Sequence, residues 1–364
     1  MMTRRGLILG GGVALLGLGG VMWAISPGQP APLLDGAGCR IDGSLSAKVF
    51  AQINGDRQGM FIQSTDLANP VLLFLHGGPG MPEFFLNSTH PAGLEQDFTV
   101  VWWEQRGAGL SFNPEIAPNS MTLAQMIADT IAVTHHLLTR FGKDKIFLLG
   151  HSWGSFLGIQ VAAAAPDLFH AYIGMGQVSW QLRSEMAALA YMIETYGAQG
   201  DATMVRRLKA APVSLTEGLS TAYLSLRDEA MHGLGVGTTR DMSSVITGVF
   251  VPVWLCRAYT LREKVNIWRG MSYSRGFLWD DFMATDLTIR VLALDLPAYF
   301  FTGRYDFTAN HDLAMAYFNK IEAPVKGFYT FESSAHSPLF EEPQRGRDIL
   351  LRDVLRGENR LADV

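Results

Sequence analysis

Residues 145–164 read KIFLLGHSWGSFLGIQVAAA. The run Lys145–Leu149, apolar after its first residue, predicts a buried strand, and the small residues of Phe156–Ala165 predict a helix. Between them, Gly150–Gly154 fits the pattern G-x-S-x-G, which places Ser152 on a sharp turn from strand to helix. The helix N-terminus behind such a turn offers N–H groups to a developing negative charge. We therefore expect Ser152 to be a nucleophile; the alternative is a serine without chemical function in an ordinary glycine-rich turn.

The alternation of apolar runs and helical patterns continues on both sides of this stretch. An opening hairpin is predicted at Ala47–Ile53 and Gly59–Gln63, with Asn54-Gly55 at its turn. Further strands are predicted at residues 71–75, 98–103, 171–175, 298–302 and 325–331. Helices are predicted between them and at residues 310–320 and 341–356. This order predicts an α/β fold whose mostly parallel sheet is covered by helices on both faces.

The helix expected before the central strand has recognisable ends. Thr122 is predicted to cap its N-terminus, Gln125 is expected to complete a capping box, and Gly142 ends it. The residues that repeat at helical spacing are expected to form its buried stripe, namely Ile127, Ile131, Thr134, Leu138 and Phe141.

No strand is predicted between residues 176 and 296, where the sequence indicates several helices rich in methionine and aromatic residues. We interpret this segment as a helical cap inserted before the last strands. The predicted division of the chain is an N-terminal membrane anchor or export signal at 1–25, a linker at 26–46, the first part of the core at 47–175, the cap at 176–296 and the second part of the core at 297–364.

The first residues are predicted to address the chain to the cell envelope. Arg4 and Arg5 precede the uncharged stretch Gly6–Ile25, which is long enough to span a bilayer and whose positive flank is expected to stay on the cytoplasmic side. Small residues suit cleavage near Ala24, but Pro27 opposes it. A retained membrane anchor is therefore favoured over a cleaved signal, with the rest of the chain on the non-cytoplasmic side in either case.

Composition excludes several classes of function. The chain has 364 residues, 48% hydrophobic, with a formal net charge of −5 and no basic cluster, so a nucleic-acid partner is not expected. The two cysteines, Cys39 and Cys256, are expected to be unpaired. No H-E-x-x-H pattern or cluster of ligands indicates a metal, and no cofactor is implied. The oligomeric state is left open.

Two further residues stand where an acid and a base would be needed. Asp306 follows the strand predicted at 298–302, and His336 follows the one predicted at 325–331. The order nucleophile, acid, histidine is the one that a serine on a G-x-S-x-G turn requires. We expect His336 to take the proton of Ser152 and Asp306 to hold the imidazole in the right tautomer.

Acyl transfer also needs two N–H groups that face the developing oxyanion. His76–Gly80 reads HGGPG and directly follows the strand at 71–75, where missing side chains let the backbone approach. We expect one donor to be Gly78 and the other to be Trp153, the residue after the nucleophile.

Three motifs together resemble the prolyl aminopeptidase (proline iminopeptidase) family of α/β-hydrolases. They are HGGPG at 76–80, EQRGAGLS at 104–111 and GHSWG at 150–154. The resemblance implies an α/β-hydrolase fold with a helical cap and a serine exopeptidase that releases N-terminal proline or a similar small residue. Carried over by position, it implies a triad of Ser152, Asp306 and His336, with Gly78 and Trp153 as oxyanion donors.

The chain departs from that family in two places. Glu104 stands where the family usually has aspartate, and for the nearby Arg106 we expect a structural ion pair. The family's cap glutamates bind the free amino group of the substrate, and Glu185 is the candidate for that role here. Glu194 lies nine residues on, roughly on the opposite side of the same helix, so the two are not expected to act as a pair. An exposed surface charge is the alternative for each.

These patterns leave three functions open. The first is an aminopeptidase that acts on small peptides through an acyl-enzyme. The second is a carboxylesterase or amidase that takes a small apolar ester or amide, because fold alone does not determine substrate. The third is a tethered binding protein without catalytic activity, which the intact set of candidate residues disfavours.

Overall fold

The structure is a computed structural model that describes residues 20 and 22–364. The membrane anchor or export signal predicted at 1–25 lies almost entirely outside the described residues. Among the helices that are described, none combines the length and the apolar character needed to cross a bilayer.

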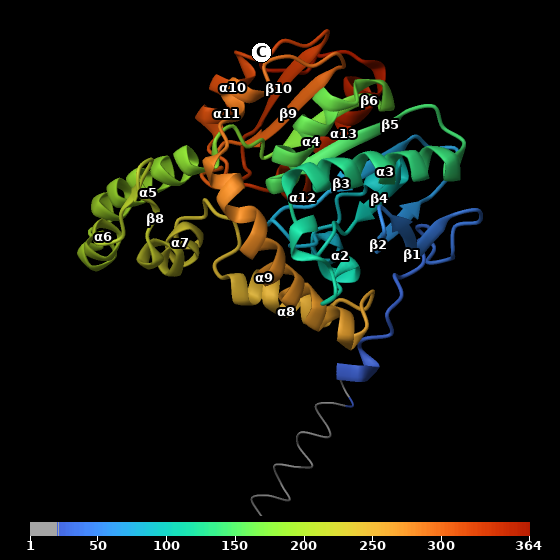
Figure 1. Ribbon diagram of the computed structural model, residues 1–364, viewed down its shortest axis with the longest axis horizontal. Coiled ribbons are helices and arrows are strands. Elements are labelled where there is room, and N and C mark those ends of the chain that lie inside the picture. The colour runs from blue at the N-terminus through green and yellow to red at the C-terminus, as the bar shows by residue number, and fades with distance from the viewer. Residues whose placement is uncertain (1–19, 21) are drawn as a thin grey trace, which may run out of the picture.

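Eight strands form one sheet in the order β1-β2-β4-β3-β5-β6-β9-β10 (Figure 1). All neighbours from β4 to β10 are parallel, whereas β2 pairs antiparallel with both β1 and β4. The predicted α/β class and opening hairpin are therefore confirmed. The strand bounds are β1 Leu45–Ile53, β2 Asp56–Ser64, β3 Val71–Leu75, β4 Thr99–Trp103, β5 Ile146–His151, β6 Phe169–Met175, β9 Ala298–Gly303 and β10 Lys326–Phe331.

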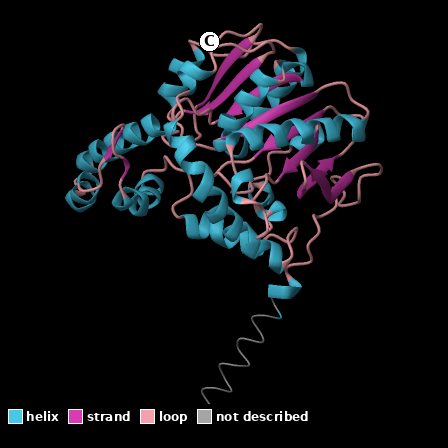
Figure 2. Cartoon of the chain, viewed as in Figure 1, coloured by secondary structure: helices cyan, strands magenta, loops and turns pink. Residues whose placement is uncertain are grey.

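Helices cover both faces of this sheet (Figure 2). Successive residues of β3 point alternately into two separate apolar cores, which explains why the strand is apolar throughout. The first core is closed by α3 Leu123–Phe141, α4 Trp153–Ala164 and α11 His311–Phe318. The second is closed by α2 Phe84–Thr89, α12 Pro338–Glu341, α13 Pro343–Arg352 and the 3₁₀ turn η6 Val354–Arg356. Further 3₁₀ turns lie at η1 Leu94–Gln96, η2 Gly109–Ser111, η3 Pro118–Ser120 and η4 Pro166–Leu168.

Helix α3 has the predicted ends but not the predicted buried stripe. Thr122 caps it by accepting a hydrogen bond of 3.2 Å from the Gln125 N–H. The expected capping box is absent, because the Gln125 side chain donates to Asp129 instead, at 2.7 Å. The fully buried face includes Met126, Asp129, Thr130, Val133, Thr134 and Leu137. Ile127, Ile131, Leu138 and Phe141 are only partly buried. Of the expected stripe, Thr134 is buried and the other four residues pack against the edge of the core. The centre of the buried face was misplaced, because two polar residues, Asp129 and Thr130, belong to it.

The closing helix predicted over 341–356 is broken into α12, α13 and η6. Pro343 begins α13, and Glu342 before it has φ −126° and ψ 61°, outside the helical region. Proline has no N–H to continue a preceding helix and disfavours helical backbone in the residue before it, so one continuous helix was a wrong expectation.

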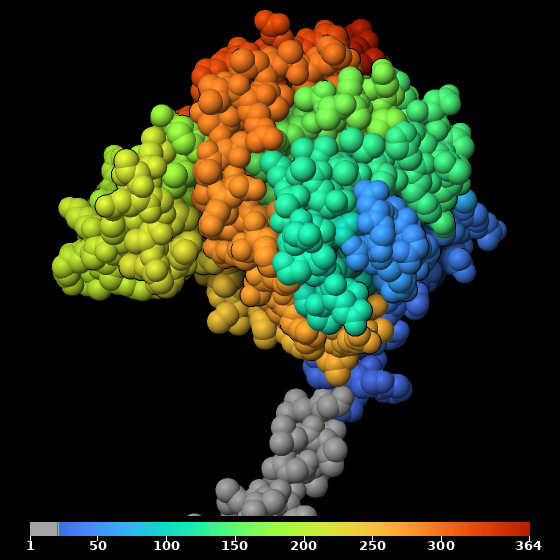
Figure 3. All heavy atoms as spheres, in the orientation of Figure 1, coloured from blue at the N-terminus to red at the C-terminus, as the bar shows by residue number. Residues whose placement is uncertain are grey.

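The segment between β6 and β9 is mainly helical, as predicted. One expectation is corrected, because a short hairpin of β7 Val213–Ser214 and β8 Gly218–Leu219 lies within it. In this segment, helices α5, α6 and α7 share a small apolar core of their own and form a lobe at the left of Figures 1 and 3. Its helical elements are α5 Gln181–Ala198, α6 Ala202–Lys209, α7 Thr221–Gly233, the π-helix η5 Ile246–Phe250, α8 Val251–Leu255, α9 Leu261–Ala284 and α10 Leu287–Arg290.

The start of the predicted linker is fixed to this cap. The Lys264 ammonium donates to the Ser26 hydroxyl at 2.8 Å and to the Ile25 carbonyl at 3.3 Å. The Gly28 N–H donates to the Arg257 carbonyl at 3.1 Å. The chain therefore enters the described fold against the beginning of α9.

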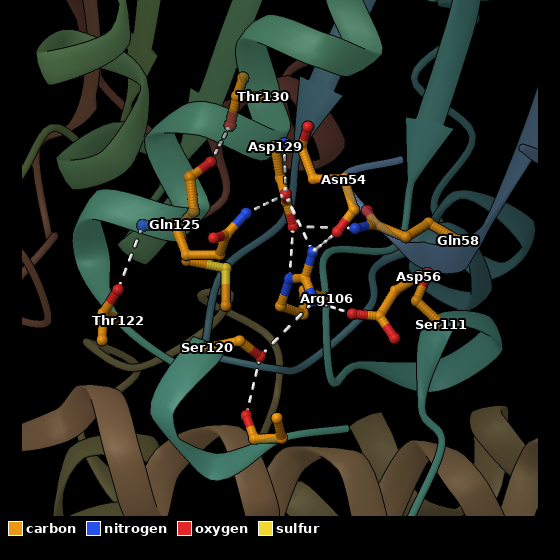
Figure 4. A network of polar contacts seen from close by, with 12 residues as sticks. Asn54, Asp56, Gln58, Arg106, Ser111, Ser120, Thr122, Gln125, Asp129 and Thr130 are labelled. Carbon is orange, nitrogen blue, oxygen red and sulfur yellow. Dashed lines mark hydrogen bonds and ion pairs between the residues drawn. The ribbon is translucent and has the colours of Figure 1, made fainter. Parts of the chain in front are cut away.

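A buried polar network joins the opening hairpin, the 104–111 motif and α3 (Figure 4). Arg106 donates from Nε to Asp129 at 2.6 Å and also pairs with Asp56. The Asp129 carboxylate accepts further hydrogen bonds at 2.7–2.8 Å from three side-chain amides, those of Asn54, Gln58 and Gln125. The expected structural ion pair of Arg106 is confirmed.

Loss of the Asp129 charge should destabilise the fold strongly. Asp129→Asn leaves a buried guanidinium with only Asp56 as its carboxylate partner, and breaking a buried pair costs about 3–5 kcal/mol. The matched control is Asp97→Asn at the ion pair with the partly exposed Arg347, where about 0–1 kcal/mol is expected. Urea unfolding measures both. Equal losses in the two variants would contradict a structural role for this network.

Candidate active site

Ser152 stands on a strained turn between β5 and α4. Its φ is 56° and its ψ −120°, a positive-φ conformation that non-glycine residues rarely adopt. The turn is tight enough that a Cβ on Gly150 would collide with the backbone of Gly154, and a Cβ on Gly154 would collide with the carbonyl of Leu75. The two glycines therefore allow the turn and bring α4 against the end of β3.

Asp306 and His336 lie together at the ends of β9 and β10. The Nδ1 atom of His336 is 2.8 Å from Oδ2 of Asp306, and because the carboxylate can only accept, Nδ1 carries the proton. The other oxygen of Asp306 accepts N–H bonds of 2.9 Å from Thr308 and Ala309. Burial alone would raise the pKa of Asp306, but the charge and hydrogen bond of His336, together with the Ala309 N–H, hold it below its ordinary value.

The other ring nitrogen of His336, Nε2, is buried and has no hydrogen-bond partner among the described residues. The His336 ring packs against that of His151, the neighbour of Ser152, with centroids 4.8 Å apart. With Nδ1 protonated, Nε2 carries a free lone pair and can accept a proton.

Ser152 opens into a pocket of about 160 Å³ between the core and the cap. Gly78 lines it from the core side, and α5, α7 and α9 line it from the cap side. The cap residues at this pocket are Gln181, Glu185, Leu224, Arg227, Asp228, Arg275, Trp279 and Phe282. Core motifs and cap therefore meet at the serine.

The two expected oxyanion donors both lie near Ser152, since Gly78 lines the same pocket and Trp153 directly follows the serine. Gly78 has φ 119°, and a Cβ there would come within 2.6–2.7 Å of the backbone nitrogens of Gly80 and Met81, so the loop requires glycine. Trp153 is the first residue of α4, where a backbone N–H has no partner within the helix. Its buried indole donates to Gln105 at 2.9 Å, which fixes the start of the helix.

Glu83 and His151 form a second acid–histidine pair that the sequence did not reveal. One Glu83 oxygen accepts the Gly77 N–H at 2.7 Å, and the other lies 2.8 Å from Nδ1 of His151. Nε2 of His151 lies 2.8 Å from the His336 carbonyl oxygen. Both ring nitrogens thus face acceptors, which suits the doubly protonated ring. Burial alone would lower the pKa of His151, but the Glu83 carboxylate and the His336 carbonyl raise it above its ordinary value.

Glu341 joins the His336 loop to the cap. Its carboxylate accepts N–H bonds from Ala335 at 2.9 Å, Ser337 at 3.2 Å and Arg240 at 2.7 Å. Burial raises the pKa of Glu341 to about 7, although these hydrogen bonds oppose the shift. The loop that carries His336 is therefore anchored by the residues directly before and after the histidine.

Glu185 is fully buried in the Ser152 pocket, so the alternative of a surface charge is wrong for this residue, while Glu194 is exposed. The Glu185 carboxylate already accepts hydrogen bonds from three side chains. The Tyr223 hydroxyl donates at 2.8 Å, Nε of Arg227 at 2.7 Å and the Gln181 amide at 2.8 Å. The charge of Glu185 is thus largely neutralised by Arg227.

Glu104 links the second motif to the cap rather than to the pocket. Its two oxygens accept from the Tyr259 hydroxyl and the Leu110 N–H, both at 2.5 Å. Burial raises the pKa of Glu104 to about 8, opposed by these two hydrogen bonds.

The chain belongs to the family described as alpha/beta hydrolase fold, which matches residues 70–343. The resemblance inferred from the three motifs is thereby confirmed, and the protein is a member of a family of hydrolases.

Several relatives and solved structures that resemble the chain carry peptidase names. The chain is 33% identical over 302 residues to a Bacillus subtilis protein named probable aminopeptidase YbaC, across 82% of this chain and 93% of that one. A stretch of 91 residues is 36% identical to proline iminopeptidase of Thermoplasma volcanium, covering 25% of this chain and 29% of that one. A proline iminopeptidase-related protein of Thermus thermophilus shares the fold, with a TM-score of 0.61 over 86% of this chain and 98% of that one at 18% identity.

The raised pKa of Glu104 should be visible in the pH dependence of stability. Its pKa is about 8 when folded against an ordinary value of 4.5, so the folded state holds more protons between these values. The stability that this group contributes therefore falls as pH rises through that window, by at most about 1.4 kcal/mol per pH unit. In Glu104→Gln, the free energy of unfolding should therefore decrease less steeply as pH rises through this range.

Urea unfolding between pH 5 and 8 tests this expectation. Glu322→Gln, at an exposed glutamate, is the control and should keep the parent slope. A Glu104→Gln profile parallel to that of the parent protein would contradict the assignment.

Proposed function

We propose that the protein is a serine hydrolase in which Ser152 is the nucleophile, His336 the general base and Asp306 the residue that orients it. The observation that carries this proposal is the unpartnered Nε2 of His336, set beside the strained Ser152 turn while Nδ1 is fixed on Asp306. A buried ring nitrogen without a partner is unfavourable for folding alone and is expected where a proton must be transferred.

The reaction follows from this arrangement. His336 Nε2 accepts the proton of the Ser152 hydroxyl as its oxygen attacks the substrate carbonyl. The backbone N–H groups of Gly78 and Trp153 stabilise the resulting oxyanion, helped by the N-terminus of α4. Protonated His336 then gives its proton to the leaving group, which leaves an acyl-enzyme. Water activated by the same nitrogen hydrolyses the acyl-enzyme and restores Ser152.

Glu83 and His151 act as positioning residues in this proposal. Their hydrogen bonds connect the Gly77 N–H, the residue before Ser152 and the His336 carbonyl. The loop with Gly78, the nucleophile turn and the histidine loop are thereby held in one arrangement before substrate arrives, which is what preorganised electrostatic stabilisation requires.

For the substrate, we propose a small peptide with a free N-terminal residue, proline or another small one. The probable aminopeptidase from Bacillus subtilis supports this class by its similarity over most of both chains. The pocket of about 160 Å³ is smaller than pockets that hold drug-sized ligands, which favours a small substrate. Two carboxylates, Glu185 and Asp228, line this pocket together with Arg227 and Arg275. The half-exposed Asp228 is the carboxylate that can accept hydrogen bonds from a substrate ammonium group.

One observation favours a second candidate, an esterase or amidase that takes an uncharged substrate. The Glu185 carboxylate is already paired with Arg227 and has three donors. A substrate ammonium would have to share that carboxylate with the guanidinium, and removing a buried partner is unfavourable. Asp228 also accepts a hydrogen bond from Arg227, at 3.1 Å, but through one oxygen only. Because more than half of its side chain is exposed, Asp228 is the carboxylate with the greater capacity to bind an amine.

Ser152→Ala should abolish turnover of any substrate that the parent protein cleaves. Removing a nucleophile of this kind lowers kcat by about 10⁶-fold. Hydrolysis of nitroanilides and nitrophenyl esters, together with covalent labelling by a fluorophosphonate, measures the loss. Ser333→Ala, at an exposed serine after β10, is the control and should keep both activities. Labelling that persists in Ser152→Ala would contradict the assignment of the nucleophile.

The substrate class is tested by comparing prolyl nitroanilide, its N-acetyl derivative and nitrophenyl acetate. For an aminopeptidase, the free amine should be strongly preferred, and Asp228→Asn should raise KM for prolyl nitroanilide by about 10-fold or more without affecting the ester. Asp312→Asn, at an almost fully exposed carboxylate, is the control. Preference for the acetylated or ester substrate would reject the peptidase and support the second candidate.

A further inference from the structure

An exposed apolar surface lies on the cap at η5 and α8. Residues 246–255 read ITGVFVPVWL and contain no charged side chain. Four of them are unusually exposed for their type, namely Ile246 at 63%, Phe250 at 46%, Val251 at 40% and Leu255 at 59%. Apolar side chains grouped in this way on a folded protein indicate an interaction site.

The surface continues onto the first turns of α9. Leu261 and Val265 are exposed and lie four residues apart, so they share one side of that helix. The Phe250 ring packs against two tryptophans beneath it, with centroids 6.0 Å from Trp254 and 5.2 Å from Trp268. We call this set the cap apolar surface: Ile246, Phe250, Val251, Leu255, Leu261 and Val265.

The N-terminal segment enters the fold at the edge of this surface (Figures 1 and 3). The Lys264 ammonium binds Ser26 and also the Trp254 carbonyl, at 2.7 Å, and so connects the entering chain to α8. Trp23, three residues before Ser26, is 76% exposed. The sequence from Gly6 to Ile25, which is uncharged and which we propose to be a membrane anchor, therefore ends beside the cap apolar surface.

The charges around the surface suit an anionic layer. No acidic residue occurs between Met242 and Arg262, whereas Arg257 and Arg262 are both exposed. Two acids border this stretch: Glu263, which pairs with Lys48 at 2.8 Å, and the exposed Asp241, which precedes Met242. Apolar side chains flanked by arginine and free of acids match the boundary between lipid headgroups and acyl chains.

We propose that the cap apolar surface rests on the lipid bilayer, with its apolar side chains among the acyl-chain ends and Arg257 and Arg262 at anionic headgroups. Moving these side chains from water into lipid is favourable, because it removes apolar area from water. A bilayer is the partner that the adjoining N-terminal segment brings within reach. The proposal does not depend on the hydrolase activity or on its substrate.

This contact would orient the active site. Helix α9 runs from Leu261 at the cap apolar surface to Trp279 and Phe282 at the Ser152 pocket. A rise of 1.5 Å per residue separates Leu261 from Trp279 by roughly 27 Å along the helix. The pocket would thus be held in the aqueous phase above the bilayer, where it would receive soluble substrates.

Site-specific fluorescence on the full chain in vesicles tests the proposal. A nitrobenzoxadiazole label is placed at Phe250→Cys, in a background with Cys39→Ser and Cys256→Ala, in vesicles of three parts phosphatidylcholine to one part phosphatidylglycerol. The matched control is Ile289→Cys on α10, which is 75% exposed and outside the cap apolar surface. Quenching by doxyl-labelled lipid and by aqueous iodide is measured at both positions.

Lipid quenching is expected to be several-fold stronger at position 250 than at position 289, and iodide quenching weaker. Equal quenching at the two positions would overturn the proposal. Protection of position 250 from both quenchers would overturn it too, because the chain's own first residues or a second copy would then cover the surface.

Hydrogen exchange of the unsubstituted full chain gives an independent measurement that needs no cysteine background. Residues 244–268 should exchange more slowly in vesicles that contain phosphatidylglycerol than in vesicles of phosphatidylcholine alone, because only the first carry an anionic headgroup for the arginines. Exchange rates that do not depend on the lipid would count against the proposal.

Discussion

The close contact between α4 and the end of β3 is the constraint on which the rest of the site depends. It exists because Gly154 has no side chain to separate the helix from the carbonyl of Leu75. The contact fixes the start of α4 behind Ser152 and places the HGGPG loop, which follows Leu75, beside that serine. A larger residue at Gly154 would move the helix away, and the candidate nucleophile and its oxyanion donors would separate even with all their side chains intact.

Two buried polar networks, one beside this contact and one between the opening hairpin and α3, have defined hydrogen-bond partners. Glu83, His151 and the backbone of His336 connect three loops that come from distant parts of the sequence. Asp129 and Arg106 do the same for the opening hairpin and α3. Buried polar networks of this kind tolerate partial satisfaction poorly, and for that reason they select one arrangement of the loops over its alternatives. Apolar packing supplies the bulk of the fold, and these networks determine where its loops lie.

Sequence reasoning succeeded where one physical effect dominated. The central strands were predicted almost to the residue because strands that are buried on both faces must be apolar throughout. It failed where tertiary partners decided the outcome. The buried stripe of α3 was misplaced because Asp129 is buried through its partners, and a carboxylate in the sequence does not reveal them. The burial of Glu185 was missed for the same reason, since its donors Tyr223 and Arg227 lie about forty residues further along the chain.

The anchorage of Ser26 and Ile25 on Lys264 has a consequence for the maturation of the protein. A processing peptidase binds its substrate as an extended strand with several residues free on each side of the cleaved bond. In the folded protein, Ser26 is buried, and its hydroxyl and the Ile25 carbonyl both accept hydrogen bonds from Lys264 at the beginning of α9. Folding of the cap would therefore compete in time with any proteolytic cleavage near Ser26, because cleavage there requires these contacts to be absent.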